Sequence, residues 1–584
     1  MQEQKRTGYP SIDKPWLKYY SEEAINAPLP ECTIYEYLWE NNKDHLDDVA
    51  LNYFDRKITY GELFGNIEKA AKAFSALGVK AGDIVVMTTV TTPETIYAFY
   101  GLNRLGAISN MVDPRTSTEG IMKYIDEVGA NLVLTIDVAL PKIEKAILGT
   151  NVRKIVVASP ADSLPQPKKA LFLLSNKLKG KSPKRSERCI VWTDFVNQGK
   201  DATPDYSSYK KDTCCVIVHT GGTTGTPKGV MLSNDNLNIM ALQYRLLGVE
   251  FNREQKFLNI MPPFIAYGVV CGIHMPLVLG LTDVLVPKFD PEGFANLVIK
   301  YKPAHMLGVP AHFEKLKNNP KMNGYNLDFF ESAGAGGDGI PENFEDDINA
   351  FLKAHKSKYP IAKGYGMTEI SSAAASCHGN VNRKQSAGIP HIKTIISVFN
   401  AETGKEQKYG ETGEICMTAP TVMLGYYHQP SETEKILRKH ADGTVWIHSG
   451  DIGHMDEDGF LYIDGRVKRL IVRHDGFKVF PSQVENVISK SEYIESCCAV
   501  GVTDKGHYQG QRPIVFAVVK SCKENAVVKA KLRELCQKEL PEYAQPVDFV
   551  FVDSLPLTPI GKIDYRALEK QAEEMSKESN SLAL

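Results

Sequence analysis

The stretch Cys215-Val-Ile-Val-His-Thr-Gly-Gly-Thr-Thr-Gly-Thr-Pro-Lys-Gly229 joins an apolar run to a loop of glycines and threonines. The run 215–218 is typical of a buried strand. The glycines allow a tight turn whose backbone N–H groups meet at one place, and Lys228 adds a cation. These are the parts of a polyphosphate site, with six candidate nucleotide contacts: Thr220, Gly221, Gly222, Thr223, Thr224 and Gly225.

This loop differs from a Walker loop. Thr226 and Pro227 separate Gly225 from Lys228, and no serine or threonine follows that lysine. A plain surface hairpin rich in glycine and threonine is the alternative interpretation of the composition.

The chain on the N-terminal side of the loop alternates strand-like and helical patterns. Thr92 and Pro93 are typical of a helix start, and the helix would bury Ile96, Phe99 and Tyr100. Strand-like runs lie at 84–90, 107–112, 132–136, 154–158 and 216–219. This alternation predicts the α/β class, with mostly parallel sheets covered by helices.

On the C-terminal side the pattern changes twice. From 405 to 466, short strand-like runs (414–417, 444–448 and 460–463) alternate with Gly-rich turns, which predicts a small β-barrel-like, antiparallel subdomain. After Arg466, helix signals at Pro481 and Asn525 and strand signals at 498–502, 514–519 and 547–552 indicate an α+β unit. We expect an N-terminal catalytic domain, residues 1–466, and a small mobile C-terminal domain, residues 467–584, with a polar tail after Leu568.

The composition is that of a globular protein close to neutrality. The 584 residues include 68 Lys+Arg and 70 Asp+Glu, a net charge of −2, and 43% are hydrophobic. The hydrophobic content excludes a disordered chain, and the near-neutral charge lacks the basic excess that nucleic-acid binding needs. The 11 cysteines form no C-x-x-C pair, which favours free thiols. With no signal peptide or apolar span visible, the expected localisation is cytoplasmic.

One segment departs from this neutrality. Residues 168–188 carry eight basic residues and one acid, a net charge of +7, around the apolar run 170–174. Gly180 and Pro183 interrupt any long helix here, which favours a solvated loop. The alternative is a peripheral contact with an anionic membrane surface.

Further motifs follow the loop in a fixed order. They are Gly364-Tyr-Gly-Met-Thr-Glu369, Gly410-Glu-Thr-Gly-Glu-Ile415 with Gly425-Tyr426, Trp446-Ile-His-Ser-Gly-Asp451 with Asp458-Gly-Phe460, Gly465-Arg-Val-Lys468 and Leu557-Thr-Pro-Ile-Gly-Lys562. Together with the loop they resemble the adenylate-forming superfamily of acyl- and aryl-CoA synthetases, amino-acid adenylation domains and luciferases. The loop spelling Thr-Gly-Gly-Thr-Thr-Gly is most similar to acyl-CoA synthetases, and the resemblance covers nearly the whole chain.

The resemblance implies a two-step reaction with ATP, Mg²⁺ and coenzyme A. A carboxylate attacks the α-phosphate of ATP to form an acyl-adenylate and pyrophosphate, and the acyl group then passes to a thiol. The acid is already ionised at neutral pH, so no general base is needed. The site must align two anions and stabilise the charge that grows on the phosphate.

Individual roles follow from the matched motifs. Lys562 would bridge the carboxylate and the α-phosphate, Glu369 would hold Mg²⁺, and Thr368 would contact the α-phosphate. Lys228 is the further catalytic cation. The remaining implied positions are Tyr365 on adenine, Gly334 and Ala335 lining the adenine and acyl site, Asp451 and Arg466 at the ribose, Lys468 as the hinge, and Gly476 and Lys478 for coenzyme A.

The segment 261–268 determines the expected substrate class. Amino-acid adenylation domains usually carry an aspartate nearby that pairs with the substrate ammonium, and this segment contains none. An unpaired buried ammonium would be unfavourable by several kcal/mol. Ile265, Tyr267 and Val269 instead predict an apolar acyl pocket.

The expected function is an ATP-dependent acid–CoA ligase for a medium- or long-chain fatty acid or another acid without a charged amine. The alternative is a ligase that loads the phosphopantetheine of a carrier protein in trans. A nucleotide-binding scaffold without catalysis is disfavoured by the intact Lys562, Glu369 and Asp451.

Overall fold

The Gly/Thr loop follows strand β8 (Cys214–His219), which pairs in parallel with β4 (Ile108–Met111) and antiparallel with β9 (Gly229–Ser233). The first sheet has the order β19-β9-β8-β4-β3-β5-β6-β7. Its other strands are β3 (Ile84–Thr88), β5 (Leu132–Ile136), β6 (Lys154–Ala158), β7 (Cys189–Val191) and β19 (Gly425–Tyr426). The predicted parallel sheet is confirmed, and β5 and β6 have the predicted bounds.

A second sheet packs against the first through a shared hydrophobic core. Its order is β16-β15-β14-β13-β12-β10-β11-β1-β2. The strands are β1 (Val49–Tyr53), β2 (Arg56–Thr59), β10 (Lys256–Asn259), β11 (Thr282–Leu285), β12 (His305–Gly308), β13 (Ser332–Gly336), β14 (Ala362–Tyr365), β15 (Ala375–Ser376) and β16 (Ile389–Pro390).

Helix α5 (Pro93–Arg104) begins as the sequence predicts. The Thr92 hydroxyl accepts a hydrogen bond from the Thr95 N–H at 3.3 Å, and Pro93 occupies the first turn. The side chains of Ile96, Phe99 and Tyr100 are fully buried. The other helices of the body are α1 (Pro10–Asp13), α2 (Glu22–Asn26), α3 (Ile34–Asn42), α4 (Tyr60–Ala76), α6 (Thr118–Val128), α7 (Leu140–Ala146), α9 (Trp192–Gln198), α10 (Asn234–Arg245), α11 (Met275–Val278), α12 (Phe294–Tyr301) and α13 (Pro310–Lys317).

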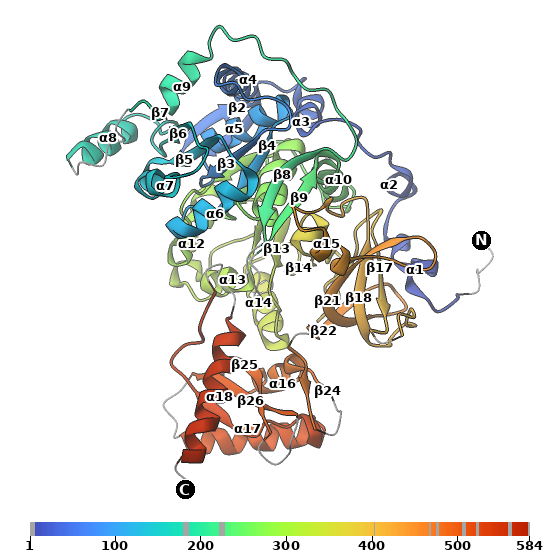
Figure 1. Cartoon of the computed structure of the whole chain (residues 1–584). Coiled ribbons are helices and arrows are strands. Elements are labelled where there is room, and N and C mark those ends of the chain that lie inside the picture. Colours follow the sequence, from blue (N-terminus) through green and yellow to red (C-terminus); the bar gives the residue numbers. More distant parts are fainter. Residues whose placement is uncertain are drawn as a thin grey trace.

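The third sheet is antiparallel and lies beside the body (Figure 1), in the order β17-β18-β21-β20, with β22 on β21. Its strands are β17 (Ile395–Phe399), β18 (Gly413–Thr418), β20 (Leu437–Lys439), β21 (Val445–Met455) and β22 (Leu461–Arg466). Strand β21 runs well beyond the predicted 444–448, because it continues through a bulge described below.

The C-terminal unit is a small α+β structure below the body (Figure 1). Its elements are β23 (Ile471–Val472), β24 (Lys478–Val479), α16 (Pro481–Ser489), β25 (Ile494–Thr503), β26 (Gln511–Val519), α17 (Asn525–Glu539), β27 (Phe549–Phe551) and α18 (Tyr565–Ser581). The residues after Leu568, predicted to be a polar tail, are helical up to Ser581 in α18, and Ala572 is buried against the C-terminal sheet. The domain boundary at Arg466 stays a prediction.

The chain is known here from a computed structural model. It describes residues 6–178, 186–220, 228–401, 403–466, 469–474, 478–504, 510–520, 525–558 and 563–581. Within these ranges the cysteines are free thiols, as predicted. No helix in the described ranges has an apolar stretch long enough for a membrane span.

Candidate active site

The β8–β9 hairpin holds both ends of the predicted phosphate loop. The Thr220 N–H donates to the Lys228 carbonyl at 3.0 Å, and the Lys228 N–H donates to the Thr220 hydroxyl at 3.2 Å. The loop between them, with the predicted contacts Gly221, Gly222, Thr223, Thr224 and Gly225, lies outside the described residues. The structure therefore fixes where the loop starts and ends.

Lys228, at the end of this hairpin, is linked to Glu369 through Tyr426. Its Nζ lies 4.7 Å from the centre of the Tyr426 ring, and it forms an ion pair with Glu432 of α15 (Pro430–Ile436). The Tyr426 hydroxyl donates to Glu369 Oε1 at 2.6 Å. The predicted phosphate cation and the predicted metal-binding carboxylate thus contact the same tyrosine.

Glu369 has the environment of a cation ligand. It follows Thr368 in a short 3-10 helix, and the turn before it requires Gly366, because a Cβ there would lie 1.8 Å from the Ser372 carbonyl. Burial raises the pKa of the Glu369 carboxyl, and the Tyr426 hydroxyl and the charge of Lys228 only partly offset this. A buried carboxylate with so little compensation fits a divalent cation as its partner.

The predicted adenine and ribose residues meet at one point. The Tyr365 hydroxyl, at the end of β14, donates to Asp451 Oδ2 at 2.7 Å, and Arg466 Nε donates to Asp451 Oδ1 at 2.6 Å. Asp451 and Arg466 are paired across β21 and β22. Tyr365 and Asp451 are 86 positions apart in the sequence, and Arg466 is 15 positions beyond Asp451, yet the three side chains form one hydrogen-bonded set.

Of the candidate acyl residues, Tyr267 lies close to β12 and β13. The Tyr267 hydroxyl donates to the Gly308 carbonyl at 3.4 Å, where Gly308 pairs with Ala335. A Cβ on Gly336 would lie 3.7 Å from that hydroxyl, so the tyrosine ring reaches the end of β13. Residue Ile265 is half-buried, whereas Val269 is fully buried in the core of the body.

The neighbouring Gly334 faces the Leu307 side chain of β12, which would have to shift to accommodate a larger residue. A Cβ at this position would lie 2.6 Å from Leu307 Cδ2 on β12. The glycine therefore lets β12 and β13 carry their side chains close together beside the site.

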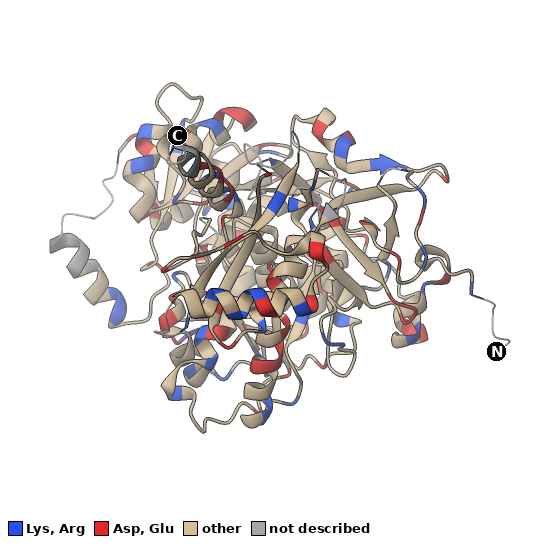
Figure 2. Cartoon of the chain, turned by 90° about the horizontal axis from the view of Figure 1, so that it is seen from below, with Lys and Arg blue, Asp and Glu red and all other residues tan. Residues whose placement is uncertain are grey.

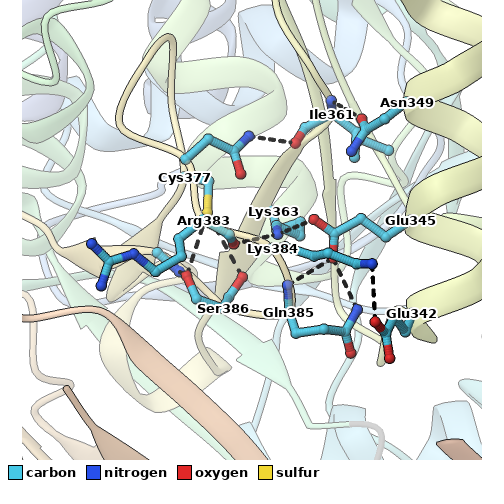
Figure 3. A network of polar contacts seen from close by, with 12 residues as sticks. Glu342, Glu345, Asn349, Ile361, Lys363, Cys377, Arg383, Lys384, Gln385 and Ser386 are labelled. Atoms are coloured by element: carbon cyan, nitrogen blue, oxygen red, sulfur yellow. Dashed lines mark hydrogen bonds and ion pairs between the residues drawn. The ribbon is translucent and has the colours of Figure 1, made fainter.

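Strand β14 is anchored by a buried ion pair (Figure 3). Lys363 on β14 contacts Glu345 of α14 (Glu342–Ala354), and their side chains are only 5% and 2% exposed. Lys363 Nζ also donates to the Arg383 carbonyl at 2.7 Å, and Glu345 accepts from the Gln385 N–H at 2.9 Å. This network holds the strand that ends in Tyr365.

A bulge in β21 presents Asp451 to the site. On β18, Glu414 pairs with Ile452 and Cys416 with His448, so Ile415 faces residues 449–451 of β21. The Ser449 hydroxyl donates to the Ile415 carbonyl at 2.6 Å and accepts from the Asp451 N–H at 3.0 Å. Bulges of this kind redirect a side chain out of a strand.

Two hydrogen bonds to Glu414 stabilise this bulge, and we call this arrangement the latch. Glu414 Oε1 accepts from the Gly450 N–H at 3.1 Å, and its Oε2 accepts from His448 Nδ1 at 2.8 Å. Burial raises the pKa of Glu414, but the hydrogen bonds from His448 and Gly450 outweigh this and hold it below its ordinary value. On the other side of its ring, His448 Nε2 forms a hydrogen bond with His440 Nε2 at 3.0 Å.

Among the described residues, Glu414, Cys416 and His448 are also the set with metal-ligating atoms within 4.8 Å of one another. Glu414 already accepts two hydrogen bonds and both ring nitrogens of His448 have partners. The set therefore works as a hydrogen-bonded latch.

Glu414→Ala should raise KM for ATP about tenfold and change kcat much less. The bulge that carries Asp451, the predicted ribose contact, would lose its support, whereas the residues predicted to act in the chemical step would be unaffected. Steady-state kinetics with varied ATP measure this. Glu414→Gln keeps an acceptor for the Gly450 N–H and should be milder, and the exposed Glu457→Ala is the matched control. A fall in kcat at unchanged KM would contradict the latch.

Several predicted residues stay untested by geometry. Lys562, Lys468 and Gly476 lie outside the described residues, and of Lys478 only the backbone in β24 is described. Conversely, two contributors were not predicted: Glu432, which pairs with Lys228, and Glu414. Glu414 lies inside the motif Gly410–Ile415, which could have indicated a role for it. Glu432 lies in none of the motifs.

Comparisons with known proteins give the family. The chain matches AMP-binding enzymes over residues 38–427 and the C-terminal domain of AMP-binding enzymes over residues 483–562. It therefore belongs to the AMP-binding enzyme family, and the predicted superfamily and enzyme class are confirmed.

Relatives are similar over nearly the whole chain. A long-chain-fatty-acid–CoA ligase of Bacillus subtilis (strain 168) is 30% identical over 573 residues, 96% of this chain and 98% of the relative. A probable 4-coumarate–CoA ligase 1 of Dictyostelium discoideum is 28% identical over 574 residues, 93% of this chain and 96% of the relative.

Solved structures share the fold. The anthranilate CoA ligase AuaEII in complex with anthranoyl-AMP has a TM-score of 0.80 at 20% identity, with 96% of this chain and 100% of that chain covered. ATP-bound MatB from Rhodopseudomonas palustris has a TM-score of 0.79 at 21% identity, with 93% and 99% covered. The predicted α/β fold with a smaller C-terminal domain is confirmed.

Proposed function

We propose that this enzyme is an AMP-forming acid–CoA ligase that activates a medium- or long-chain fatty acid or another acid without a charged amine. The observation that carries the proposal is the meeting of Tyr365, Asp451 and Arg466 in one hydrogen-bonded set. This set offers a ring for a base and a carboxylate for vicinal hydroxyls. The second set, Lys228 with Tyr426 and Glu369, offers the charges that a polyphosphate needs.

The first half-reaction needs position and charge and no general base. Asp451 accepts hydrogen bonds from the ribose hydroxyls, with Arg466 beside it, and Tyr365 stacks on the adenine. Lys228 and Thr368 contact phosphate oxygens, and the loop 220–225 would supply further donors from its backbone N–H groups. These fixed donors stabilise the charge that develops on the α-phosphate as pyrophosphate leaves.

Glu369 is the residue that would hold Mg²⁺, which neutralises phosphate charge when bound. The C-terminal domain, residues 467–584, supplies Lys562 to the carboxylate and the α-phosphate. Its rotation about Lys468 then brings Gly476 and Lys478 to coenzyme A for the second half-reaction. Both steps use one set of nucleotide-binding residues and two arrangements of the small domain.

The composition of the segment that contains the candidate acyl residues supports the substrate class. Ile265, Tyr267 and Val269 are apolar or aromatic, and 261–268 contains no carboxylate to pair with an ammonium. The named relatives use a long-chain fatty acid and 4-coumarate, neither of which carries an amine. An α-amino acid would bury its ammonium without a partner.

A panel of acids with ATP and free coenzyme A tests this function. Fatty acids of graded length, aryl acids and α-amino acids are compared by acyl-CoA formation, and we expect thioesters from fatty or aryl acids only. A parallel series replaces coenzyme A with a phosphopantetheinyl carrier protein. If only the carrier accepts the acyl group, the enzyme loads carriers and the proposal is wrong.

A further inference from the structure

Helix α8 (Lys168–Leu178) projects from the outer edge of the molecule. It lies in the connection between β6 and β7, where β7 is the edge strand of the first sheet. Figures 1 and 2, seen from directions 90° apart, both show the helix extending away from the body. The segment predicted to be a solvated loop is therefore helical up to Leu178.

The helix exposes large apolar side chains. Leu171 is 66% exposed and Leu174 is 56% exposed. They are three residues apart, so they lie on the same face of the helix. Two leucines held in water on a projecting helix are unfavourable unless a partner covers them.

The base of the helix is tied to the body by its first two lysines. Lys168 Nζ lies 3.1 Å from Asp55 Oδ2, and Lys169 Nζ donates to the Asp162 carbonyl at 2.9 Å. These contacts hold the start of α8 in place. Leu171 and Leu174, in the next turn, are therefore held at a fixed place at the outer edge of the molecule.

The positive charge of the segment that contains α8 favours an anionic partner. The sequence 168–188 carries a net charge of +7 in a chain whose total is −2. Lipid surfaces with anionic headgroups attract such basic segments and accept apolar side chains at the headgroup boundary. A second copy of the chain would bring two segments of the same strong charge together, which is unfavourable.

We propose that α8 is a docking element for the surface of an anionic phospholipid bilayer. Leu171 and Leu174 enter the headgroup boundary, and the net positive charge of 168–188 attracts the anionic surface. This inference concerns binding alone and does not depend on the proposed reaction. For an enzyme that uses apolar acids, it would place the enzyme at the phase into which those acids partition.

Flotation of the full chain with lipid vesicles tests the proposal without any substrate. The probes are vesicles of phosphatidylcholine alone and vesicles of equal parts phosphatidylcholine and phosphatidylglycerol. We expect binding only to the second, weakening as salt is raised. Leu171→Glu/Leu174→Glu should lower the partition coefficient by on the order of a hundredfold.

A matched control separates position from charge. Ile12→Glu/Leu29→Glu makes the same chemical change at side chains that are 62% and 40% exposed near the N-terminus, and it should bind as the wild type does. Thermal unfolding checks that both variants fold. Equal flotation of the α8 variant and the wild type, or no flotation of the wild type with anionic vesicles, overturns the proposal. So does a wild-type oligomer in gel filtration that the α8 variant abolishes while flotation is unchanged.

Discussion

Lys562→Ala is expected to lower acid-dependent exchange of labelled pyrophosphate into ATP by about a hundred- to a thousandfold. The lysine would supply the positive charge that bridges the carboxylate and the α-phosphate, and loss of one such preorganised group has an effect of this size. Transfer of the acyl group from a preformed acyl-adenylate to the thiol should continue at close to the wild-type rate. The two half-reactions are measured separately, the first by exchange and the second by thioester formation.

The control for this variant is Lys570→Ala. Lys570 lies on α18 of the same domain with its side chain 80% exposed, so its loss should leave both half-reactions unchanged. Equal loss of both half-reactions in Lys562→Ala would contradict the assigned role, because it would indicate general damage to the small domain.

Lys363→Ala is expected to lower the free energy of unfolding by about 3–5 kcal/mol, the range for a buried ion pair that loses one partner. The Glu345 carboxylate would remain buried without its cation. Chemical denaturation followed by fluorescence measures the change. Because Lys363 lies two residues before Tyr365, KM for ATP should rise in the same variant.

Two further variants make the test specific. Lys358→Ala removes an ion pair to Glu331 from the surface and should change stability by less than about 1 kcal/mol. Lys363→Met/Glu345→Leu removes both charges together and should recover most of the lost stability. A single Lys363→Ala variant as stable as Lys358→Ala would show that the pair does not anchor β14.

The parts of the fold that the sequence predicts are those with continuous apolar runs. Strands β5 and β6 have the predicted bounds, because each is a short buried β-branched run with clear ends. Strand β13, Ser-Ala-Gly-Ala-Gly, has no such signal and is a strand only because β12 and β14 pair with it on both sides. The sequence predicts a polar tail where α18 continues past Leu568, because Ala572 is an isolated apolar contact in a polar stretch.

Some residues of the site could be predicted from the sequence and others could not. The motifs predict Tyr365, Asp451 and Arg466, and the fold brings them into one hydrogen-bonded set. The pairing of Lys228 with Glu432 joins residues 204 positions apart, and nothing local in the sequence marks it. The role of Glu414 depends on the bulge at 449–451, which arises from the pairing of two strands and not from either strand alone.

The central claim is that this chain activates a carboxylic acid with ATP and passes it to coenzyme A. Acid-dependent exchange of labelled pyrophosphate into ATP, followed by addition of coenzyme A to the same mixture, tests it most directly. We expect exchange with a fatty or aryl acid, none with an α-amino acid, and acyl-CoA and AMP in equal amounts after coenzyme A is added. Absence of exchange across the whole acid panel would contradict it and would favour a nucleotide-binding protein without catalysis.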